Sequence, residues 1–208
     1  MAFLISVDAG AQYILNGDFE INNAIVGTDE LQLTNSQFNL FVPDCFSYGQ
    51  PSLANLDLMS TEGWWGGGLA FSGHWFVGMT LPDRLSLKLS NPLVPGHVYQ
   101  LSWYDRASVN FCAGPVGIGL STTPMVTEVY VYTSPYSPEI GIWKLRQFQF
   151  TATIPASYIT VSQYSFEDCW VQIDDFCLSA DLSCAAPAAI RMPNVFTPNG
   201  DGSNDLFI

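Results

Sequence analysis

Hydrophobic and polar residues alternate along the middle and the later part of the chain. From residue 85 to 90, leucines alternate with serines and a lysine, and from residue 99 to 103, aromatic residues and leucine alternate with glutamine and serine. A period of two is typical of half-buried β-strands. The same period recurs in four later segments: 127–133 (TEVYVYT), 146–154 (RQFQFTATI), 158–165 (YITVSQYS) and 170–179 (WVQIDDFCLS).

The segments between these predicted strands are turns rich in proline and glycine, such as NPLVPGH at 91–97. No segment of helical length carries an apolar stripe at i, i+3 and i+4, and only 52–60 (SLANLDLMS) has room for one or two helical turns. The sequence therefore predicts an all-β fold, an antiparallel β-sandwich with jelly-roll topology.

The chain divides into one large domain and shorter flanking segments. We expect the jelly-roll domain to span 13–180 and a linker of small residues to follow at 181–191 (DLSCAAPAAIR). Residues 1–12 (MAFLISVDAGAQ) combine a short apolar stretch with small residues, which fits either the remnant of a secretory leader or a first strand. Residues 192–208 form a separate, strand-like closing arm.

Charge excludes several classes of partner. Six lysines and arginines stand against 19 acidic residues, for a net charge of −13, so nucleic acid and anionic membrane surfaces are not expected partners. No apolar run approaches the about 20 residues of a membrane-spanning helix, so no membrane insertion is expected. Only 12% of residues are charged while 14% are aromatic, which favours surfaces that pack against another molecule.

Five cysteines, Cys45, Cys112, Cys169, Cys177 and Cys184, contain no C-x-x-C pair. They argue against a zinc site and favour disulfides in an oxidising compartment, with one thiol left over. Cys177 and Cys184 are a feasible pair, because a turn-forming linker separates them. Cys169 and Cys177 are not, because both lie in one extended segment and eight residues at about 3.3 Å each exceed disulfide reach.

Acidic residues lie in two of the strand-like segments. In ILNGDFE, alternation puts Asp18 and Glu20 on one face and the core residue Phe19 on the other. In VQIDDFCLS, only one of Asp174 and Asp175 can face the same ion, because neighbouring strand residues point to opposite faces. Calcium takes six to eight oxygen ligands and suits a site built from two strand ends. Solvated acids at a strand edge are the alternative interpretation.

Tryptophans are the natural platform for a sugar, because a flat ring stacks on the apolar face of a pyranose. Trp64, Trp65 and Trp75 lie in a region rich in glycine and aromatic residues (EGWWGGGLAFSGHWF) and are the candidate ligand-binding residues. Core packing is the alternative for each of them.

Signatures of catalysis are weak. His74 and His97 lie in loop or turn sequences, and neither has a nucleophile motif around it. We therefore expect that the protein is not an enzyme and has no catalytic residues.

A resemblance appears in these same segments. LNGDFE, FSGHWFVGM, LPDRLSLKLSNPLVPGHVYQLSWYDRAS and VQIDDFCLS are similar to jelly rolls of the carbohydrate-binding-module type (family 4/9-like, galactose-binding-like) in secreted Bacteroidetes proteins. The resemblance covers about Tyr13 to Ala180. It implies a structural calcium that ties the first strand to the last through Glu20 and Asp174, with Asp18 as a further candidate ligand.

The closing PNVFTPNGDGSNDLFI resembles the start of the C-terminal sorting domain of type IX secretion cargo, of the type B or gliding-motility-associated kind. That family's domain continues further, so residues 192–208 correspond to a truncated start. The resemblance implies contact with the type IX secretion machinery and a location outside the cell or on its surface.

Two functions follow as expectations. The first is a noncatalytic, extracellular cell-surface module, stabilised by calcium, that binds a glycan or another surface ligand and serves adhesion. The second is a self-assembling structural subunit of an extracellular filament or surface layer, a homo-oligomer formed by strand addition of the C-terminal arm.

Overall fold

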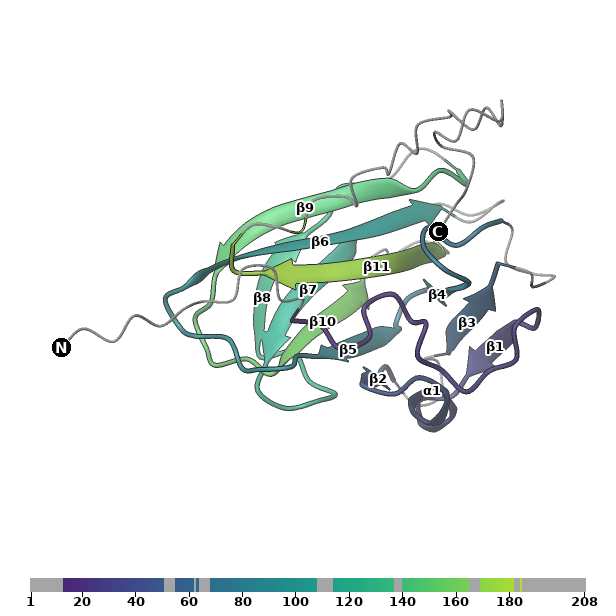
Figure 1. Cartoon of the computed structure of the whole chain (residues 1–208), viewed down its shortest axis with the longest axis horizontal. Coiled ribbons are helices and arrows are strands. Elements are labelled where there is room, and N and C mark those ends of the chain that lie inside the picture. Colours follow the sequence, from purple (N-terminus) through teal and green to yellow (C-terminus); the bar gives the residue numbers. More distant parts are fainter. Residues whose placement is uncertain are drawn as a thin grey trace, which may run out of the picture.

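Two antiparallel sheets form a β-sandwich in the computed structural model of the chain, which describes residues 13–50, 55–61, 63, 68–107, 114–136, 140–164, 169–181 and 184. In Figure 1 the long strands β6, β9 and β11 lie in front of β7, β8 and β10. The six-stranded sheet has the order β1 (Glu30–Leu33), β3 (Leu56–Ser60), β4 (Trp75–Met79), β11 (Val171–Ser179), β6 (Val98–Ala107) and β9 (Lys144–Thr151). The five-stranded sheet has the order β2 (Cys45–Ser47), β5 (Arg84–Lys88), β10 (Tyr158–Gln163), β7 (Val116–Ser121) and β8 (Val129–Thr133).

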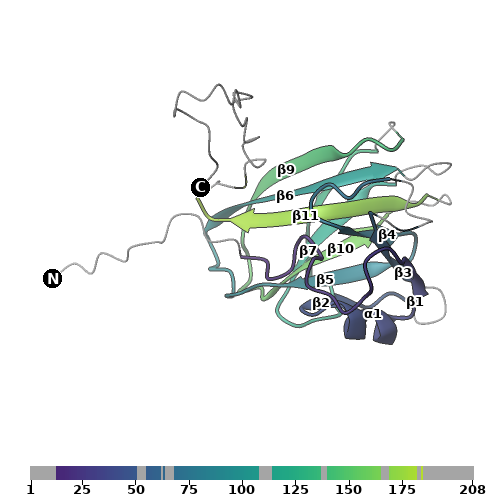
Figure 2. The ribbon, with the colours of Figure 1, turned by 45° about the vertical axis from the view of Figure 1, so that its right-hand side comes forward.

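This arrangement confirms the predicted all-β sandwich. Alternation places Leu85 and Leu87 of β5 in the core, with Ser86 on the opposite face of its sheet. Figure 2 shows the same two layers from another side. In this article the outer face of a sheet is the face turned away from the shared core.

Aromatic side chains fill the middle of the core. The rings of Trp103 and Phe176 are stacked with centroids 5.8 Å apart, and Phe19 meets Phe176 edge to face at 6.3 Å. All three side chains are buried, and full burial of a large apolar side chain contributes about 1.5–3 kcal/mol. These contacts join the N-terminal segment, β6 and β11 into one core.

The N-terminal segment differs from its prediction. Residues around Asp18 and Glu20 form a turn, not a strand, and Phe19 has a positive φ of 58°. The turn lies against β11, where the Phe176 N–H donates to the Gly17 carbonyl at 2.9 Å. A Cβ at position 17 would collide with the Phe176 carbonyl, so this close approach requires glycine.

The predicted helical turn in 52–60 is wrong, because Leu56–Ser60 is strand β3, paired with both β1 and β4. Within the described part of the chain, one helix, α1 (Asn35–Phe41), occurs at a place that hydrophobic periodicity missed. Its start is a capping box, in which Thr34 and Gln37 bond each other's backbone N–H groups. Of its seven residues only Phe38 is buried, so the helix shows no apolar stripe that hydrophobic periodicity could detect.

The cysteines follow the spacing argument. Cys177 and Cys184 form a disulfide with their Cα atoms 5.6 Å apart, and Cys169 is also disulfide-bonded, so it is not joined to Cys177. Cys45 is a buried free thiol that donates to the Asn16 carbonyl at 3.4 Å, and burial raises its pKa.

The predictions for residues 1–12 and 192–208 lie outside the described residues. In the described part of the chain, no helix has the length and apolar character needed to cross a membrane.

Candidate functional site

The structure separates the three tryptophans that the sequence put forward as a ligand platform. Trp64 and Trp65 lie outside the described residues. Trp75 is 3% exposed and shares the core side of β4 with Val77 and Met79. Its ring is therefore packed inside the sandwich and has no free face for a sugar.

Two of the predicted calcium ligands hold backbone amides. Glu20 Oε1 accepts from the N–H groups of His74 and Trp75 at 2.8 and 2.7 Å. Asp174 Oδ2 accepts from those of Phe71 and Ser72 at 2.8 and 3.0 Å. The two carboxylates thus fasten residues 68–74, which we call the cover segment, over the six-stranded sheet.

The third predicted ligand, Asp18, accepts from the Glu20 N–H at a longer 3.4 Å. Asp174 Oδ1 accepts from the Asp175 N–H at 2.7 Å, and burial raises the pKa of the Asp174 carboxyl to about 8. Asp175 has a positive φ of 54° beside an irregularity in the β11–β6 register, so the simple strand alternation assumed for this acidic pair fails there. Across the described residues, no group of three or more acidic, histidine or cysteine side chains is arranged to hold a metal ion. As placed here, the carboxylates bind amides, and the residues do not form a ready calcium cage.

Arg106 is buried beneath the cover segment. Its Nε donates to Gln172 Oε1 at 2.5 Å and its Nη1 donates to the Leu69 carbonyl at 2.9 Å. The guanidinium also lies 4.2 Å from the ring centroid of Trp143 and 5.0 Å from that of Phe76. Burial lowers the pKa of Arg106 to about 10, and only 3% of the residue is exposed. This outer face therefore keeps its arginine inside an aromatic cluster.

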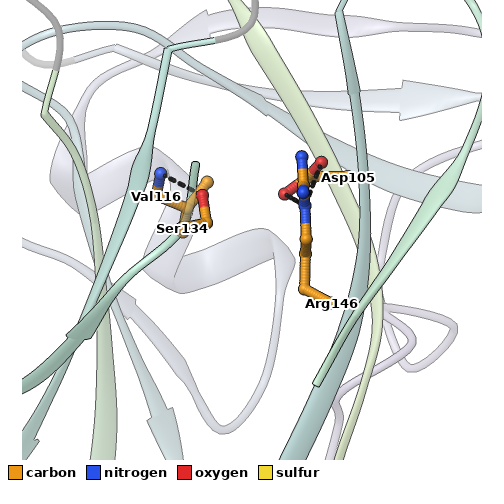
Figure 3. A network of polar contacts seen from close by, with 4 residues as sticks. All are labelled: Asp105, Val116, Ser134 and Arg146. Carbon is orange, nitrogen blue, oxygen red and sulfur yellow. Dashed lines mark hydrogen bonds and ion pairs between the residues drawn. The ribbon is translucent and has the colours of Figure 1, made fainter. Parts of the chain in front are cut away.

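A second buried arginine site lies between the sheets. Arg146 Nε donates to both carboxylate oxygens of Asp105, at 3.0 and 2.9 Å, and Figure 3 draws this pair with the hydrogen bond from the Val116 N–H to the Ser134 hydroxyl. Burial raises the pKa of Asp105 and the adjacent Arg146 opposes that shift. Because the pair is mutually satisfied and enclosed, it is a structural ion pair.

The outer face of the five-stranded sheet is different, because it carries an open groove. Tyr130 and Tyr164 are 51% and 42% exposed, and their rings meet edge to face with centroids 5.6 Å apart. We call this feature the tyrosine groove; it is lined by Leu81, Pro82, Arg84, Tyr130, Ser162, Gln163 and Tyr164.

The strands below the groove explain its shape. Ser162 of β10 pairs with Arg84 of β5 on one side and with Gly117 of β7 on the other. A Cβ at Gly117 would collide with the Tyr164 ring, so the missing side chain allows that ring to lie over β7. One row of paired residues, Arg84, Ser162 and Gly117, therefore runs beneath the groove, and the Tyr164 ring rests on the glycine.

The next row along the strands is covered. There Thr160 pairs with Ser86 and with Gly119, and residues 122–128, which we call the strap, cross above them. Thr127 in the strap donates to Thr160 Oγ1 at 2.9 Å, and the Met125 N–H donates to Ser86 Oγ at 3.2 Å. A Cβ at Gly119 would collide with Thr127, so this glycine makes room for the strap. The strap bounds the groove on that side.

Polar and aromatic groups in the groove suit binding better than catalysis. Burial and the contact with Tyr130 raise the pKa of Tyr164 to about 12, so its phenol is neutral at physiological pH. Ring faces and a guanidinium can together hold a polar ring-shaped ligand. None of the groove residues is a cysteine, a histidine or a carboxylate that could serve as nucleophile or general base.

Sequence reasoning missed Tyr130, Tyr164 and Arg84. One signal was present: in VGIGLS, two of the three outward positions of a strand with an apolar inner face are glycine. Glycine inside a strand marks a place where another group approaches closely. That signal pointed to this face of the sheet, although it could not say which residues approach.

Comparison with known proteins gives the fold and no family assignment. No protein-family model and no curated protein sequence matches the chain. Among solved structures, the K3 cleaved adhesin domain of Lys-gingipain from Porphyromonas gingivalis matches with a TM-score of 0.52 and 15% identity, over 81% of this chain and 98% of that one. The CBM22-1-GH10 modules of Clostridium thermocellum endo-1,4-β-D-xylanase 10B match with a TM-score of 0.50 and 14% identity, over 82% of this chain and 29% of that one. The chain thus has a β-sandwich like those of carbohydrate-binding modules and cleaved adhesin domains.

Proposed function

We propose that the chain is a noncatalytic, extracellular cell-surface module that binds a glycan in the tyrosine groove. The observation that carries this proposal is the pair of exposed tyrosines, Tyr130 and Tyr164, that contact each other on the outer face of the five-stranded sheet. Large aromatic side chains are normally buried, so two of them exposed together beside polar groups favour a ligand surface.

The chemistry of the groove supports a saccharide ligand. Tyrosine faces stack on the C–H face of a sugar ring, while the exposed Arg84 guanidinium can bond ring oxygens or substituents. The cavity of the groove is small, about 90 Å³, and it is partly open to solvent. Small-molecule sites span roughly 300–1,000 Å³, so the groove would hold one part of a glycan whose remainder lies in solvent.

Comparison with solved structures supports the same class of function by analogy of fold. The C. thermocellum modules were solved with xylohexaose, and the P. gingivalis domain is an adhesin domain. For this chain, the secreted or cell-surface location and export by the type IX route rest on the resemblance of residues 193–208 to a sorting domain.

A structural calcium is part of the proposal. Burial raises the pKa of Asp175, and repulsion by Asp18 raises it further. A calcium ion held by Asp18, Glu20 and Asp174 would reduce such repulsion beside the cover segment, and it would require these carboxylates to move closer together than they lie in this structure. Its role would be to stabilise the fold, because these residues lie outside the groove lining.

A glycan array followed by titration calorimetry tests the binding proposal. We expect Tyr130→Ala and Tyr164→Ala each to weaken binding of the selected glycan by more than about tenfold, which is the usual effect of removing an aromatic anchor. Tyr136→Ala is the matched control, because Tyr136 is also exposed but does not line the groove. If no glycan binds, or if the control variant weakens binding as much as the groove variants, the proposal is wrong.

Assembly into a filament or layer is the second candidate, and one observation favours it. Strand β9 is an edge strand of the six-stranded sheet: it pairs with β6 on one side, and among the described strands none pairs with its other edge. An edge strand presents N–H and C=O groups to which another strand can add, and residues 192–208 of a second copy would supply that strand. Electron microscopy of the full chain and of a chain lacking 192–208 tests this. Assemblies that persist after the deletion exclude strand donation by the arm.

A further inference from the structure

We infer that the tyrosine groove selects an acidic saccharide, one whose sugar ring carries a carboxylate or a sulfate, and that Arg84 binds that anionic group. This inference rests on the proposed glycan-binding function and specifies its ligand class.

The other lysines and arginines in the described part of the chain all have interaction partners. Lys88 is 2.9 Å from Asp44 Oδ1, Arg146 is paired with Asp105, and Arg106 donates to Leu69 and Gln172. Lys144 also has an interaction partner. Among the lysines and arginines in the described part of the chain, Arg84 alone has a side chain with neither a hydrogen bond nor an ion pair.

The nearest acid in the sequence does not neutralise Arg84. Asp83 is buried, and its two carboxylate oxygens accept from the backbone N–H groups of Asn55 and Thr80 at 2.7 and 2.8 Å. Both oxygens are thus engaged in holding the turn before β5. Arg84 thus lines the wall of the groove without an ion-pair partner among the described residues.

Arg84 lies where its guanidinium can contact a ligand in the groove. It pairs across the sheet with Ser162, whose other neighbour, Gly117, lies under the Tyr164 ring, and Arg84 lines one groove with Tyr130 and Tyr164. A guanidinium presents parallel N–H donors that match a carboxylate or sulfate in a bidentate geometry. A sugar ring stacked on a tyrosine would therefore place an anionic substituent within reach of the arginine.

The charge of the whole protein sharpens the argument. With a net charge of −13, the molecule repels anions over most of its surface, so general attraction cannot bring an acidic glycan to it. Binding of such a ligand requires a local cation, and the groove contains one without a partner. Tyr164 is compatible with an anion, because a phenol whose pKa is about 12 stays uncharged beside it.

Titration calorimetry with matched probes tests the inference. The probes are a galacturonic acid trimer, its fully methyl-esterified form, and a galactose oligomer bearing sulfate esters. The ester keeps the rings and removes the charge. We expect the native chain to bind an acidic probe at least about tenfold more tightly than the ester, and Arg84→Gln to abolish that preference. Preference for the sulfated probe over the carboxylated one would support the anion site and identify sulfate as its ligand.

Lys88→Gln is the control variant, because it removes a cation from the same strand, β5, at a position outside the groove lining. We expect it to leave the preference unchanged. Equal binding of acid and ester by the native chain, or an unchanged preference in Arg84→Gln, overturns the inference while Tyr130→Ala still shows whether the groove binds glycan. If no saccharide of either kind binds, the proposed function fails and the inference fails with it.

Discussion

The two outer faces of the sandwich each carry an arginine, and the two arginines have opposite surroundings. Arg106, on the six-stranded sheet, is bonded to Gln172 and to the Leu69 carbonyl and stacked against Trp143. Arg84, on the five-stranded sheet, has no such partner and lines a groove with two exposed tyrosines. The strands supply a similar platform on both sides, so the difference comes from the segments that cross them.

Each crossing segment is positioned by a few specific contacts. The cover segment is fastened by Glu20 and Asp174, two carboxylates far from it in sequence, which capture its backbone amides. The strap is held by Thr127 and by the Met125 N–H, and it closes only one row of its sheet. A few loop contacts therefore decide which outer face of this sandwich is covered.

The largest expected effect tests the covered arginine. Arg106→Ala removes two hydrogen bonds and a cation–π contact from a buried site, and we expect the free energy of unfolding to fall by about 3 kcal/mol. Arg84→Ala, at an exposed site, should change it by less than about 0.5 kcal/mol. Urea unfolding followed by tryptophan fluorescence measures both. Equal losses in the two variants would remove the distinction between the faces.

Removal of calcium with a chelator tests whether the carboxylates alone hold the cover segment in place. If calcium binds at Asp18, Glu20 and Asp174, adding it at 100 times its dissociation constant stabilises the fold by about 2.7 kcal/mol. We therefore expect EDTA to lower the melting temperature and Glu20→Gln to remove the response to calcium. An unfolding curve that is the same with EDTA and with calcium would mean that the amide contacts suffice.

Acidity tests two buried carboxyls, one near each face. Burial raises the pKa of both Asp57 on β3 and Asp83 before β5 to about 6, from an ordinary value of 3.8. When the folded-state pKa lies above the unfolded-state pKa, the stability it gives is complete below the unfolded-state pKa and is lost as the pH rises through the folded-state pKa. We expect the free energy of unfolding to fall by at least about 2 kcal/mol between pH 4 and pH 7, and Asp174, whose pKa is about 8, adds to this fall.

Asp57→Asn is the control for this pH dependence, because the amide keeps an oxygen for the Gln32 N–H that Asp57 accepts at 2.6 Å. It should flatten part of the slope between pH 4 and pH 7. Denaturant unfolding at a series of pH values measures both chains, and a stability that rises over this range would contradict the prediction.

The smallest effect concerns the exposed face. Gly117→Ala places a methyl group where the Tyr164 ring lies, so the ring must move. We expect binding of the groove ligand to weaken by about tenfold, or about 1.4 kcal/mol, with only a minor loss of stability. Gly96→Ala provides a comparison, because no atom lies near its added Cβ. Its φ of 87° means that an alanine there is strained through the backbone and not through a contact. Unchanged binding in Gly117→Ala would show that the position of Tyr164 is unimportant.

The sequence predicted those parts of the fold in which side chains alternate regularly. Strands β5, β6, β9, β10 and β11 lie within or across the predicted segments, because burial of one face imposes a period of two. Local backbone geometry escaped the same reasoning. The turn at Phe19 and the irregular register at Asp175 both involve positive φ angles that propensity and periodicity do not reveal.

The candidate site was less predictable, for a physical reason. Tyr130 and Tyr164 come from different parts of the chain and read as ordinary strand aromatics, and their exposure depends on where the strap ends. The sequence around Trp75 is rich in glycine and resembles a loop. Trp75 nevertheless belongs to the core, because its strand β4 pairs with β3 and β11 and places its side chain on the inner face. Exposure of a particular aromatic residue is a property of the folded chain and not of its own neighbourhood in the sequence.

Cys45 has a consequence for how the motions of this molecule can be measured. Its thiol is buried in β2 against the Asn16 carbonyl, and its raised pKa keeps it protonated and unreactive while the sheet edge is closed. A thiol reagent can react there only when β2 separates from β5. The rate of modification under native conditions therefore reports how often this edge opens, while the Cys177–Cys184 disulfide at the end of β11 does not react with the reagent. The chain thus contains a chemical reporter of local opening that needs no introduced label.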